Sequence, residues 1–482
     1  MRIAFLHPDL GIGGAERLVV DAAVGLQNRG HDVHVYTSHH DSSHCFEETR
    51  DGTLRVHAIH PPVPRAILGK FHILLAHLRQ LHLTYKLLTG SELPYDVYFV
   101  DQLSTCVPFL RILGKTRVVF YCHFPDKLLA NGELIEEKGR GDGEIRFRMK
   151  KKGSLMKQLY RYPMDWLEEV TTRQADRILA NSKFTSRVFK SYFPSIQQEP
   201  TIVYPGINIQ AYTSEIDHSD PDIVTVTSLR PTLLSLNRFE RKKNAALAVE
   251  AFARLRSRNK QSGQNMRLVL AGGYDPRLED NVQTLKHLVD IVSYTHKLSF
   301  SVITPSNSSV AAPQPSTAST ADADVIFLLN FTTAQRTALL RSPSTLCLLY
   351  TPANEHFGIG PVEGMICGVP VLACDSGGPV ESLIEFPPSE RTGWLRSPDP
   401  LLWADALHDI VSMSDAERQA VGARGRRRAQ EVFGIEAMAA SIERELEAAI
   451  NMGRVEDGET LRVIGAILVG LIIALFIGPR VF

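Results

Sequence analysis

Two glutamates stand eight positions apart in the segment Glu355-His-Phe-Gly-Ile-Gly-Pro-Val-Glu363, with two glycines between them. Upstream, the segment Arg238-Phe-Glu-Arg-Lys-Lys243 concentrates positive charge. Carboxylates bind hydroxyl groups, whereas Arg and Lys side chains neutralise phosphate oxygens. A nucleotide sugar carries hydroxyls and a diphosphate in one molecule. The two segments together therefore predict a nucleotide-sugar site.

Each segment also has an ordinary structural interpretation. Glu363 falls in the first turn of an expected helix at 361–367, where a carboxylate stabilises the helix N-terminus. The cationic segment has the composition of a solvated basic loop. However, the two glycines supply backbone freedom that a helix start does not need. Arg238 also follows an expected strand at 232–236 almost directly. Both observations favour binding.

Two further candidates lie in the first part of the chain. The loop Gly11-Ile-Gly13-Gly14 separates an expected strand at 2–7 from an expected helix at 15–27. Its glycines would let the backbone approach a phosphate, although a plain tight turn explains them equally well. His123 follows an expected strand at 117–121, at the end where ligands of parallel sheets collect. A purely structural histidine remains the alternative.

Strands and helices are expected to alternate in two series, at 1–205 and 206–450. In the second series the expected strands are 232–236, 266–271, 325–327, 347–350 and 369–373, and the expected helices are 244–255, 280–294, 332–342 and 361–367. This alternation predicts an α/β protein with two doubly wound, Rossmann-like domains facing a cleft. Within the second domain, Ser299–Asp324 is rich in Ser, Ala and Pro and predicts a disordered surface insertion.

Two segments have membrane-related interpretations. The run from Val463 to Ile477 is apolar or glycine throughout and lies between Arg462 and Arg480. Its length is near the roughly 17–25 residues of a spanning helix. We expect a membrane anchor at 461–479, with a span favoured over partial insertion or a buried core helix. The Leu- and His-rich stretch 67–88 fits either an amphipathic helix on a membrane surface or a helix that faces the core.

Composition excludes some classes of function. The 482 residues include 53 Lys and Arg and 53 Asp and Glu, so the formal net charge is zero. This balance argues against general affinity for nucleic acid. The six cysteines form no Cys-x-x-Cys pair and show no zinc-ligand spacing, which predicts free, buried thiols and no metal site.

Taken together, the motifs resemble the retaining glycosyltransferases of family 4, which have the two-domain GT-B fold. The resemblance spans about residues 1–440. Its parts are Gly13-Gly14, His123, Arg238 with Lys243, the turn Ala271-Gly-Gly273, and Glu355 with Gly358 and Glu363. Longer stretches around Phe5–Arg17, Tyr121–Asp126, Tyr204–Gly206 and Ser235–Asn244 are similar to the mannosyltransferases of the dolichol-linked oligosaccharide pathway.

The resemblance implies a role for each matching residue. Arg238 and Lys243 would bind the donor diphosphate, and Glu363 would bind the ribose. Glu355 would contact hydroxyls of the donor sugar, and His123 would contact that sugar as well. The backbone of Phe357, Gly358, Ile359 and Gly273 would line the donor site, and Gly13 and Gly14 would line the acceptor and phosphate side. No metal or other cofactor is implied as obligatory.

The resemblance also implies a reaction and a place. The donor would be GDP-mannose, and the acceptor a dolichol-diphosphate-linked oligosaccharide at the cytosolic face of the endoplasmic reticulum membrane. An alpha-1,3-linked mannose and then an alpha-1,6-linked mannose would be added, with other enzymes of the pathway as further partners. Two alternatives stay open: a family-4 enzyme with another donor or lipid acceptor, and a catalytically silent, membrane-tethered scaffold.

Overall fold

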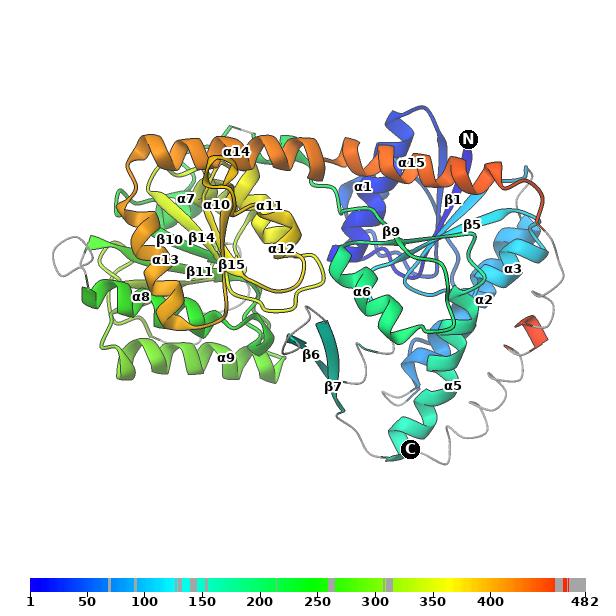
Figure 1. The fold of residues 1–482 in the computed structure, drawn as a ribbon, viewed down its shortest axis with the longest axis horizontal. Helices are drawn as coiled ribbons and strands as arrows, with labels where there is room; N and C mark the ends of the chain where they lie inside the picture. Colours follow the sequence, from blue (N-terminus) through cyan, green and yellow to red (C-terminus); the bar gives the residue numbers. More distant parts are fainter. Residues whose placement is uncertain are drawn as a thin grey trace. The chain divides into compact units, whose positions relative to one another are not determined.

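The computed structural model describes two compact units, each built around its own parallel sheet (Figure 1). The first unit comprises Met1–Gly206 and Ile435–Phe482, and the second comprises Ile207–Gly434. The described residues are 1–67, 71–90, 93–125, 128, 132–138, 145–151, 155–213, 215–258, 265–306, 308, 315–455, 463–465 and 467.

The sheet of the first unit has seven parallel strands in the order β3-β2-β1-β4-β5-β8-β9. They are β1 (Arg2–His7), β2 (Asp32–Thr37), β3 (Arg55–Ala58), β4 (Val97–Asp101), β5 (Arg117–Cys122), β8 (Arg177–Ala180) and β9 (Thr201–Ile202). Successive residues of β1 and β4 are buried, as expected for strands covered on both faces.

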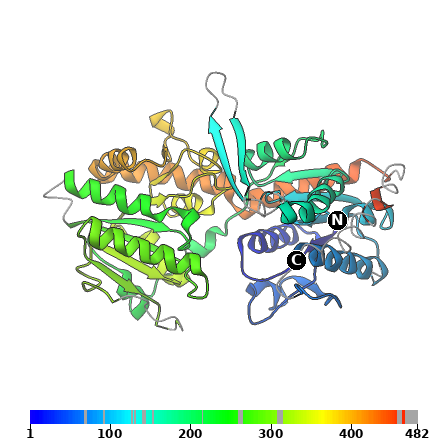
Figure 2. The same ribbon diagram turned by 90° about the horizontal axis from the view of Figure 1, so that it is seen from below.

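The remaining elements of the first unit are mostly helices. They are α1 (Gly14–Asn28), η1 (Glu47–Thr49), α2 (His72–Gly90), α3 (Val107–Ile112), α5 (Leu155–Thr172), α6 (Lys183–Tyr192) and α15 (Ile435–Asn451). β6 (Gly132–Lys138) and β7 (Ile145–Lys151) form an antiparallel hairpin, which Figure 2 shows as a separate two-stranded ribbon.

The expected domain boundary at 450 is wrong, because α15 belongs to the first unit. Met438, Ile442 and Leu446 of α15 are buried in the same apolar core as Leu18 and Val19 of α1. An amphipathic helix pattern reveals that one face is buried, but it does not reveal which core buries that face. The chain therefore passes between the units twice, at 206–207 and at 434–435.

The second unit also has a seven-stranded parallel sheet, in the order β12-β13-β11-β10-β14-β15-β16. The strands are β10 (Thr232–Leu236), β11 (Arg267–Gly272), β12 (Phe300–Ile303), β13 (Val325–Leu329), β14 (Thr345–Tyr350), β15 (Val371–Cys374) and β16 (Gly393–Arg396). The other elements are η2 (Ile209–Tyr212), α7 (Pro221–Val226), η3 (Arg241–Lys243), α8 (Ala245–Arg258), α9 (Glu279–Asp290), η5 (Ile291–Thr295), α10 (Thr333–Arg341), α11 (Ile359–Ile366), α12 (Pro379–Ser382), η6 (Pro388–Glu390), α13 (Pro400–Ser412) and α14 (Asp415–Phe433).

The segment 299–324 is not wholly a disordered insertion, because it contributes the edge strand β12. Phe300 and Val302 are buried in the core of the second unit. The backbone N–H of Thr317 donates to the carbonyl of Phe300 at 2.9 Å. The hydroxyls of Ser316 and Thr317 accept from the N–H groups of Val302 and Phe300. Residues 307 and 309–314 lie outside the described residues.

Most of the expected anchor at 461–479 also lies outside the described residues. Of the part that is described, Val463 and Ile467 are buried in one apolar cluster with Leu74 of α2 and Met164 and Leu167 of α5. Within the described ranges, no helix is long and apolar enough to cross a membrane. The anchor therefore stays a prediction.

Two other expectations have a structural answer. Residues of α2 such as Leu74, Leu83 and Leu87 are buried, which favours the core-facing alternative for the stretch 67–88.

All six cysteines are free, and five of them are buried, as predicted: Cys45, Cys106, Cys122, Cys347 and Cys374.

Candidate functional site

In the second unit, the predicted site residues follow the carboxyl ends of neighbouring strands. Arg238 and Lys243 come after β10, Gly273 comes after β11, and Glu355 comes after β14. These three strands are adjacent, in the order β11-β10-β14, and they are parallel. Because carboxyl ends of parallel strands share one edge of the sheet, the chain brings these residues to the edge where ligands bind in such folds.

Lys243 and Glu355 form a direct ion pair in which Lys243 Nζ lies 2.5 Å from Glu355 Oε2. Burial alone would raise the pKa of Glu355, but the charge and hydrogen bond of Lys243 outweigh burial and lower it. Glu355 is therefore ionised at neutral pH. The hydroxyl of Thr351, which is fully buried, donates to the carbonyl of Lys243 at 2.7 Å and fixes the backbone beneath the pair.

The loop from Asn354 to Gly358 is held from two sides. The backbone N–H of Gly378 donates to the carbonyl of Glu355 at 2.8 Å. Gly358 has a φ of 81°, and a Cβ there would lie 2.7 Å from the hydroxyl oxygen of buried Tyr350. Only glycine satisfies both the backbone angle and the close approach to the ring. The loop thus leads into α11, whose first N–H groups lack carbonyl partners within the helix.

Glu363 is nearly buried on α11 and is bound by two side chains from elsewhere in the second unit. The Tyr212 hydroxyl donates to Glu363 Oε1 at 2.5 Å, and Arg336 Nη1 donates to the same oxygen at 3.0 Å. The Arg336 guanidinium also stacks over the Tyr212 ring, 4.7 Å from its centroid. Since both bonds go to Oε1, the other oxygen, Oε2, makes no hydrogen bond to the described part of the chain. It is available to a ligand.

Arg238 lies against the glycine turn that follows β11. A Cβ at Gly272 would collide with the carbonyl of Asn237, and a Cβ at Gly273 would lie 3.6 Å from Arg238 Cγ. The turn therefore needs glycine at 272 to pass beside the strand end. The Arg238 side chain is 66% exposed, and its guanidinium lies 3.4 Å from Glu240. An exposed cation of this kind can still bind an anionic ligand.

In the first unit, His123 lies just beyond β5 and its Nε2 is 2.8 Å from Asp101 Oδ2. The same carboxylate also binds His7, at the end of β1. β1, β4 and β5 are adjacent, so the three residues again meet at the carboxyl edge of a sheet. The backbone of His123 is fixed by Asn181, whose Nδ2 donates to the His123 carbonyl at 2.8 Å.

The glycine loop of the first unit ends at the start of α1. A Cβ at Gly13 would meet the carboxylate of Glu16, the movable end of a flexible side chain, so this contact does not by itself require glycine. A Cβ at Gly14 would meet no atom within 4 Å. The ligand-binding role of this loop therefore stays a prediction.

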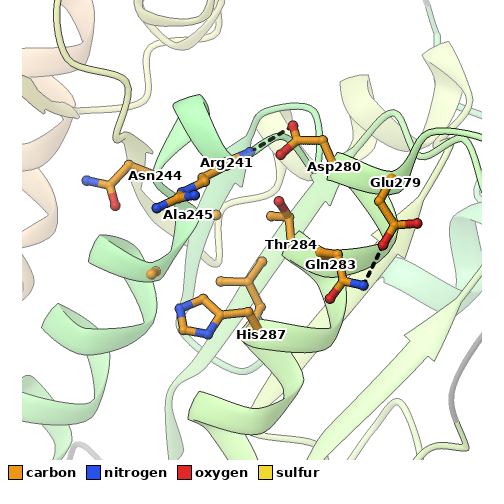
Figure 3. A pocket seen from close by; sticks show the side chains of 10 residues that line it. Arg241, Asn244, Ala245, Glu279, Asp280, Gln283, Thr284 and His287 are labelled. Carbon is orange, nitrogen blue, oxygen red and sulfur yellow. Dashed lines mark hydrogen bonds between the residues drawn. The ribbon is translucent and has the colours of Figure 1, made fainter. Parts of the chain in front are cut away.

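A separate pocket of about 720 Å³ lies between the start of α8 and α9 (Figure 3). Arg241 and Asn244 line one side, and Asp280, Gln283 and His287 line the other. The backbone N–H of Arg241 donates to Asp280 Oδ2 at 3.2 Å, which joins η3 to α9. None of the predicted nucleotide-sugar residues lines this pocket, although Arg241 and Lys243 share η3.

Several side chains that support the site escaped the sequence prediction. His7 and Asp101 bind one another across 94 positions, and Tyr212 reaches Glu363 across 151 positions. Arg336 lies in α10, where its sequence context gives no signal. One sequence feature could have indicated His7 and Asp101. Each is the last residue of a buried strand, and His123 directly follows another such strand. Among the described residues there is no cluster of His, Cys, Asp and Glu that could hold a metal ion.

Comparisons with known proteins identify relatives over most of the chain. Residues 12–211 match the model described as Glycosyltransferase Family 4, and residues 317–428 match Glycosyl transferases group 1. The chain is 46% identical over 446 residues to the Alpha-1,3/1,6-mannosyltransferase ALG2 of Rhizomucor pusillus, covering 92% of this chain and 90% of that protein. It is 39% identical over 455 residues to the protein of the same name from Saccharomyces cerevisiae, covering 93% and 85%.

Solved structures show the same fold at low sequence identity. Sucrose-phosphate synthase from Thermosynechococcus elongatus is 17% identical with a TM-score of 0.64, and the match covers 94% of this chain and 100% of that chain. Anabaena HepE in complex with UDP and glucose is also 17% identical, with a TM-score of 0.59 and coverage of 93% and 100%. The two Rossmann-like units thus have the architecture of GT-B glycosyltransferases.

Proposed function

The chain belongs to the alpha-1,3/1,6-mannosyltransferase family of glycosyltransferases, and from that membership we propose its donor, acceptor and catalytic residues. It is an enzyme that transfers mannose. The donor is GDP-mannose. The acceptor is Man1GlcNAc2-diphosphodolichol, which receives an alpha-1,3-linked mannose, and the Man2 product then receives an alpha-1,6-linked mannose to give Man3GlcNAc2-diphosphodolichol.

The observation that carries this proposal is the ion pair between Lys243 and Glu355 at the edge of the sheet that also holds Arg238. It places a cation for phosphate beside a carboxylate for hydroxyls, as a nucleotide sugar requires. Lys243 and Arg238 bind the diphosphate and stabilise the negative charge that develops as GDP leaves. Glu355 accepts hydrogen bonds from hydroxyls of the mannose.

The other residues of the second unit bind the rest of the donor. Glu363 receives two hydroxyls of the ribose on Oε2, because Tyr212 and Arg336 already occupy Oε1. The backbone N–H groups of Phe357, Gly358 and Ile359, at the start of α11, face the donor sugar and phosphate, and Gly273 lets the diphosphate approach the backbone.

The first unit contributes the remaining groups of the proposal. His123 contacts the mannose during transfer, and the loop with Gly13 and Gly14 contacts the acceptor phosphate. In the reaction the bond between mannose C1 and the phosphate oxygen breaks, and a bond from C1 to the acceptor hydroxyl oxygen forms on the same face. The proton of that hydroxyl passes to the leaving diphosphate. Arg238 and Lys243 supply the positive charge for this departure, so the proposal calls for no obligatory cofactor.

The proposed place of action is the cytosolic side of the endoplasmic reticulum membrane. The support is the apolar run from Val463 to Ile477, because a dolichol-linked acceptor is confined to a membrane. The other enzymes of the same pathway are the proposed neighbours in that membrane.

The proposal is tested by donor screening with the purified full-length chain and synthetic Man1GlcNAc2-diphosphate lipid. We expect turnover with GDP-mannose and none with UDP-glucose or other UDP-sugars. Turnover with a UDP-sugar alone would overturn the donor assignment. Absence of turnover with every donor would instead indicate a silent scaffold on the same fold.

Replacing Tyr212 with phenylalanine is expected to weaken donor binding without slowing the chemical step. The variant removes one of the two donors to Glu363. A hydrogen bond to a charged group contributes about 1.5–3 kcal/mol. We therefore expect KM for GDP-mannose to rise by about tenfold while kcat stays near the wild-type value, measured by initial rates over a range of donor concentrations.

The matched control is Tyr294→Phe, since Tyr294 is 72% exposed in the same unit. Its KM should match the wild type. A Tyr212→Phe enzyme with an unchanged KM, or with kcat reduced in the same proportion as kcat/KM, would contradict the role assigned to Glu363.

A further inference from the structure

The imidazole of His123 binds a carboxylate that a second, fully buried histidine also binds. Asp101 Oδ2 lies 2.8 Å from His123 Nε2 and 2.9 Å from His7 Nδ1, and Asp101 Oδ1 lies 2.8 Å from the same His7 nitrogen. An ionised carboxylate can only accept hydrogen bonds, so each histidine must carry a proton on the nitrogen that faces Asp101. The contacts therefore define which nitrogen of each ring is protonated.

The second nitrogen of His7 indicates the charge of that ring. Nε2 has no hydrogen-bond partner among the described residues, and Glu16 Oε1 lies 3.9 Å from it. Burial alone would lower the pKa of His7, but the charge and hydrogen bond of Asp101 and the nearby charge of Glu16 raise it to about 10. His7 is thus an imidazolium at neutral pH. Burial alone would raise the pKa of Asp101, but the charge of His7 and the hydrogen bonds from His123 and His7 outweigh burial and lower it.

The contact with Asp101 orients the ring of His123. The single negative charge of Asp101 is already compensated by His7, so Asp101 does not need a second positive charge beside it. Nε2 of His123 faces Asp101, and Nδ1 is the nitrogen on the other side of the ring. The side chain of His123 is 19% exposed, whereas the side chains of His7 and Asp101 are buried. Of the three, only His123 can reach a substrate.

The other groups around the three residues are compatible with this state. Glu16 approaches from α1, and the Tyr121 ring of β5 lies 5.0 Å from the His123 ring. Burial holds the pKa of Tyr121 well above its ordinary value, so Tyr121 adds no charge. The charges of Glu16, His7 and Asp101 therefore alternate negative, positive and negative.

We propose that His7 is a positioning residue that acts through Asp101 and fixes His123 in the tautomer with a proton on Nε2, so that His123 Nδ1 accepts a hydrogen bond from a sugar hydroxyl of the substrate. This inference rests on the proposed contact between His123 and the transferred mannose. It adds that Nδ1 of His123 makes the contact as a hydrogen-bond acceptor. It also adds that His7, which is buried and does not touch the substrate, keeps Nδ1 an acceptor. Loss of the charge on His7 would let Asp101 draw a second proton onto His123 and abolish the acceptor.

The direct test is nuclear magnetic resonance of the full-length chain with 15N-labelled histidine rings, near neutral pH. A His123→Gln sample assigns the signals of His123. We expect a neutral His123 with the proton on Nε2 in the wild type. A proton on Nδ1 instead would overturn the proposal whether or not the enzyme transfers mannose.

The His7→Asn variant keeps an amide donor near Asp101 but removes the charge. We expect both nitrogens of its His123 to be protonated near neutral pH, and kcat to fall by about tenfold, the equivalent of one lost hydrogen bond. Activity relative to the wild type should recover as the pH rises and the second proton leaves. A folded variant with unchanged His123 signals would contradict the proposal.

The control is His44→Gln, since His44 is exposed in the same unit, and its kinetics should match the wild type. If the wild type failed to transfer mannose, the proposed function would fail while the histidine signals still tested the positioning role. A purely structural role for His7 would lower stability and kcat at every pH and leave the tautomer of His123 as it is.

Discussion

The Lys243→Met enzyme is expected to turn over GDP-mannose about 10²–10³-fold more slowly than the wild type, because it lacks the less exposed of the two cations proposed to bind the leaving diphosphate. Lys243 Nζ lies 2.5 Å from Glu355, at the carboxyl end of β10. Methionine keeps the length and apolar character of the side chain. We expect most of the loss in kcat, since the negative charge on the diphosphate grows as the bond to mannose breaks. Initial rates at saturating donor measure it.

Lys242→Met is the matched control for this variant. Lys242 lies in the same η3, carries the same charge and is 73% exposed, with its Nζ 3.2 Å from Glu240. An exposed pair of this kind contributes little, so kcat should change less than about twofold. If both lysine variants kept full activity, Lys243 would not stabilise the leaving group. If both lost activity equally, the effect would belong to the net charge of η3 and not to Lys243.

The Glu355→Gln enzyme is expected to lose about 10–100-fold in kcat/KM for GDP-mannose, as the loss of a charged hydrogen-bond acceptor implies. Glutamine has the same shape but no charge, so it binds mannose hydroxyls less strongly and leaves Lys243 without a counterion. The loss should appear in single-turnover rates with GDP-mannose. The control Glu390→Gln removes an exposed carboxylate from η6 of the same unit and should be silent.

Combining Lys243→Met with Glu355→Gln tests whether the two residues act on the donor together or independently. If Lys243 and Glu355 act on the donor as a unit, the double variant should lose little more than the Lys243→Met enzyme alone. Fully additive losses would indicate that each residue acts independently of the other. A Glu355→Gln enzyme with wild-type kcat/KM would exclude Glu355 from the donor site.

Most of the sheet architecture follows from the sequence. The expected strand at 232–236 coincides with β10, and the strands expected at 2–7 and 117–121 match β1 and β5 to within one residue. These strands are continuous apolar runs followed by glycine or polar loops, which is the pattern of buried parallel strands. The strands missed in the two parallel sheets are β3, β8, β9, β12 and β16. All but β8 lie at sheet edges, and each is too short to show a long apolar run.

Two errors had a long-range cause. α15 packs on α1 although the whole second unit lies between them in sequence, and no local pattern records that contact. The segment around β12 looks too polar to be ordered. Its Ser316 and Thr317 hydroxyls, however, replace part of the hydrogen bonding that a neighbouring strand would supply.

The candidate site was predictable where motif residues lie close together in sequence. Glu355, Glu363 and Gly358 belong to one loop and one helix. Arg238 precedes η3 and Lys243 ends it, and both follow a single strand. The supporting residues were not predictable. His7, Tyr212 and Arg336 act through partners on other elements, and only the tertiary structure brings them together.

Digestion of the reaction product with linkage-specific mannosidases tests the central claim most directly. The full-length chain, GDP-mannose and Man1GlcNAc2-diphosphate lipid are the only components needed. The proposal predicts two added mannoses, one removed by an alpha-1,3-specific and the other by an alpha-1,6-specific mannosidase, with the alpha-1,3 product appearing first. A product with a single added mannose, or with any other linkage, would contradict it.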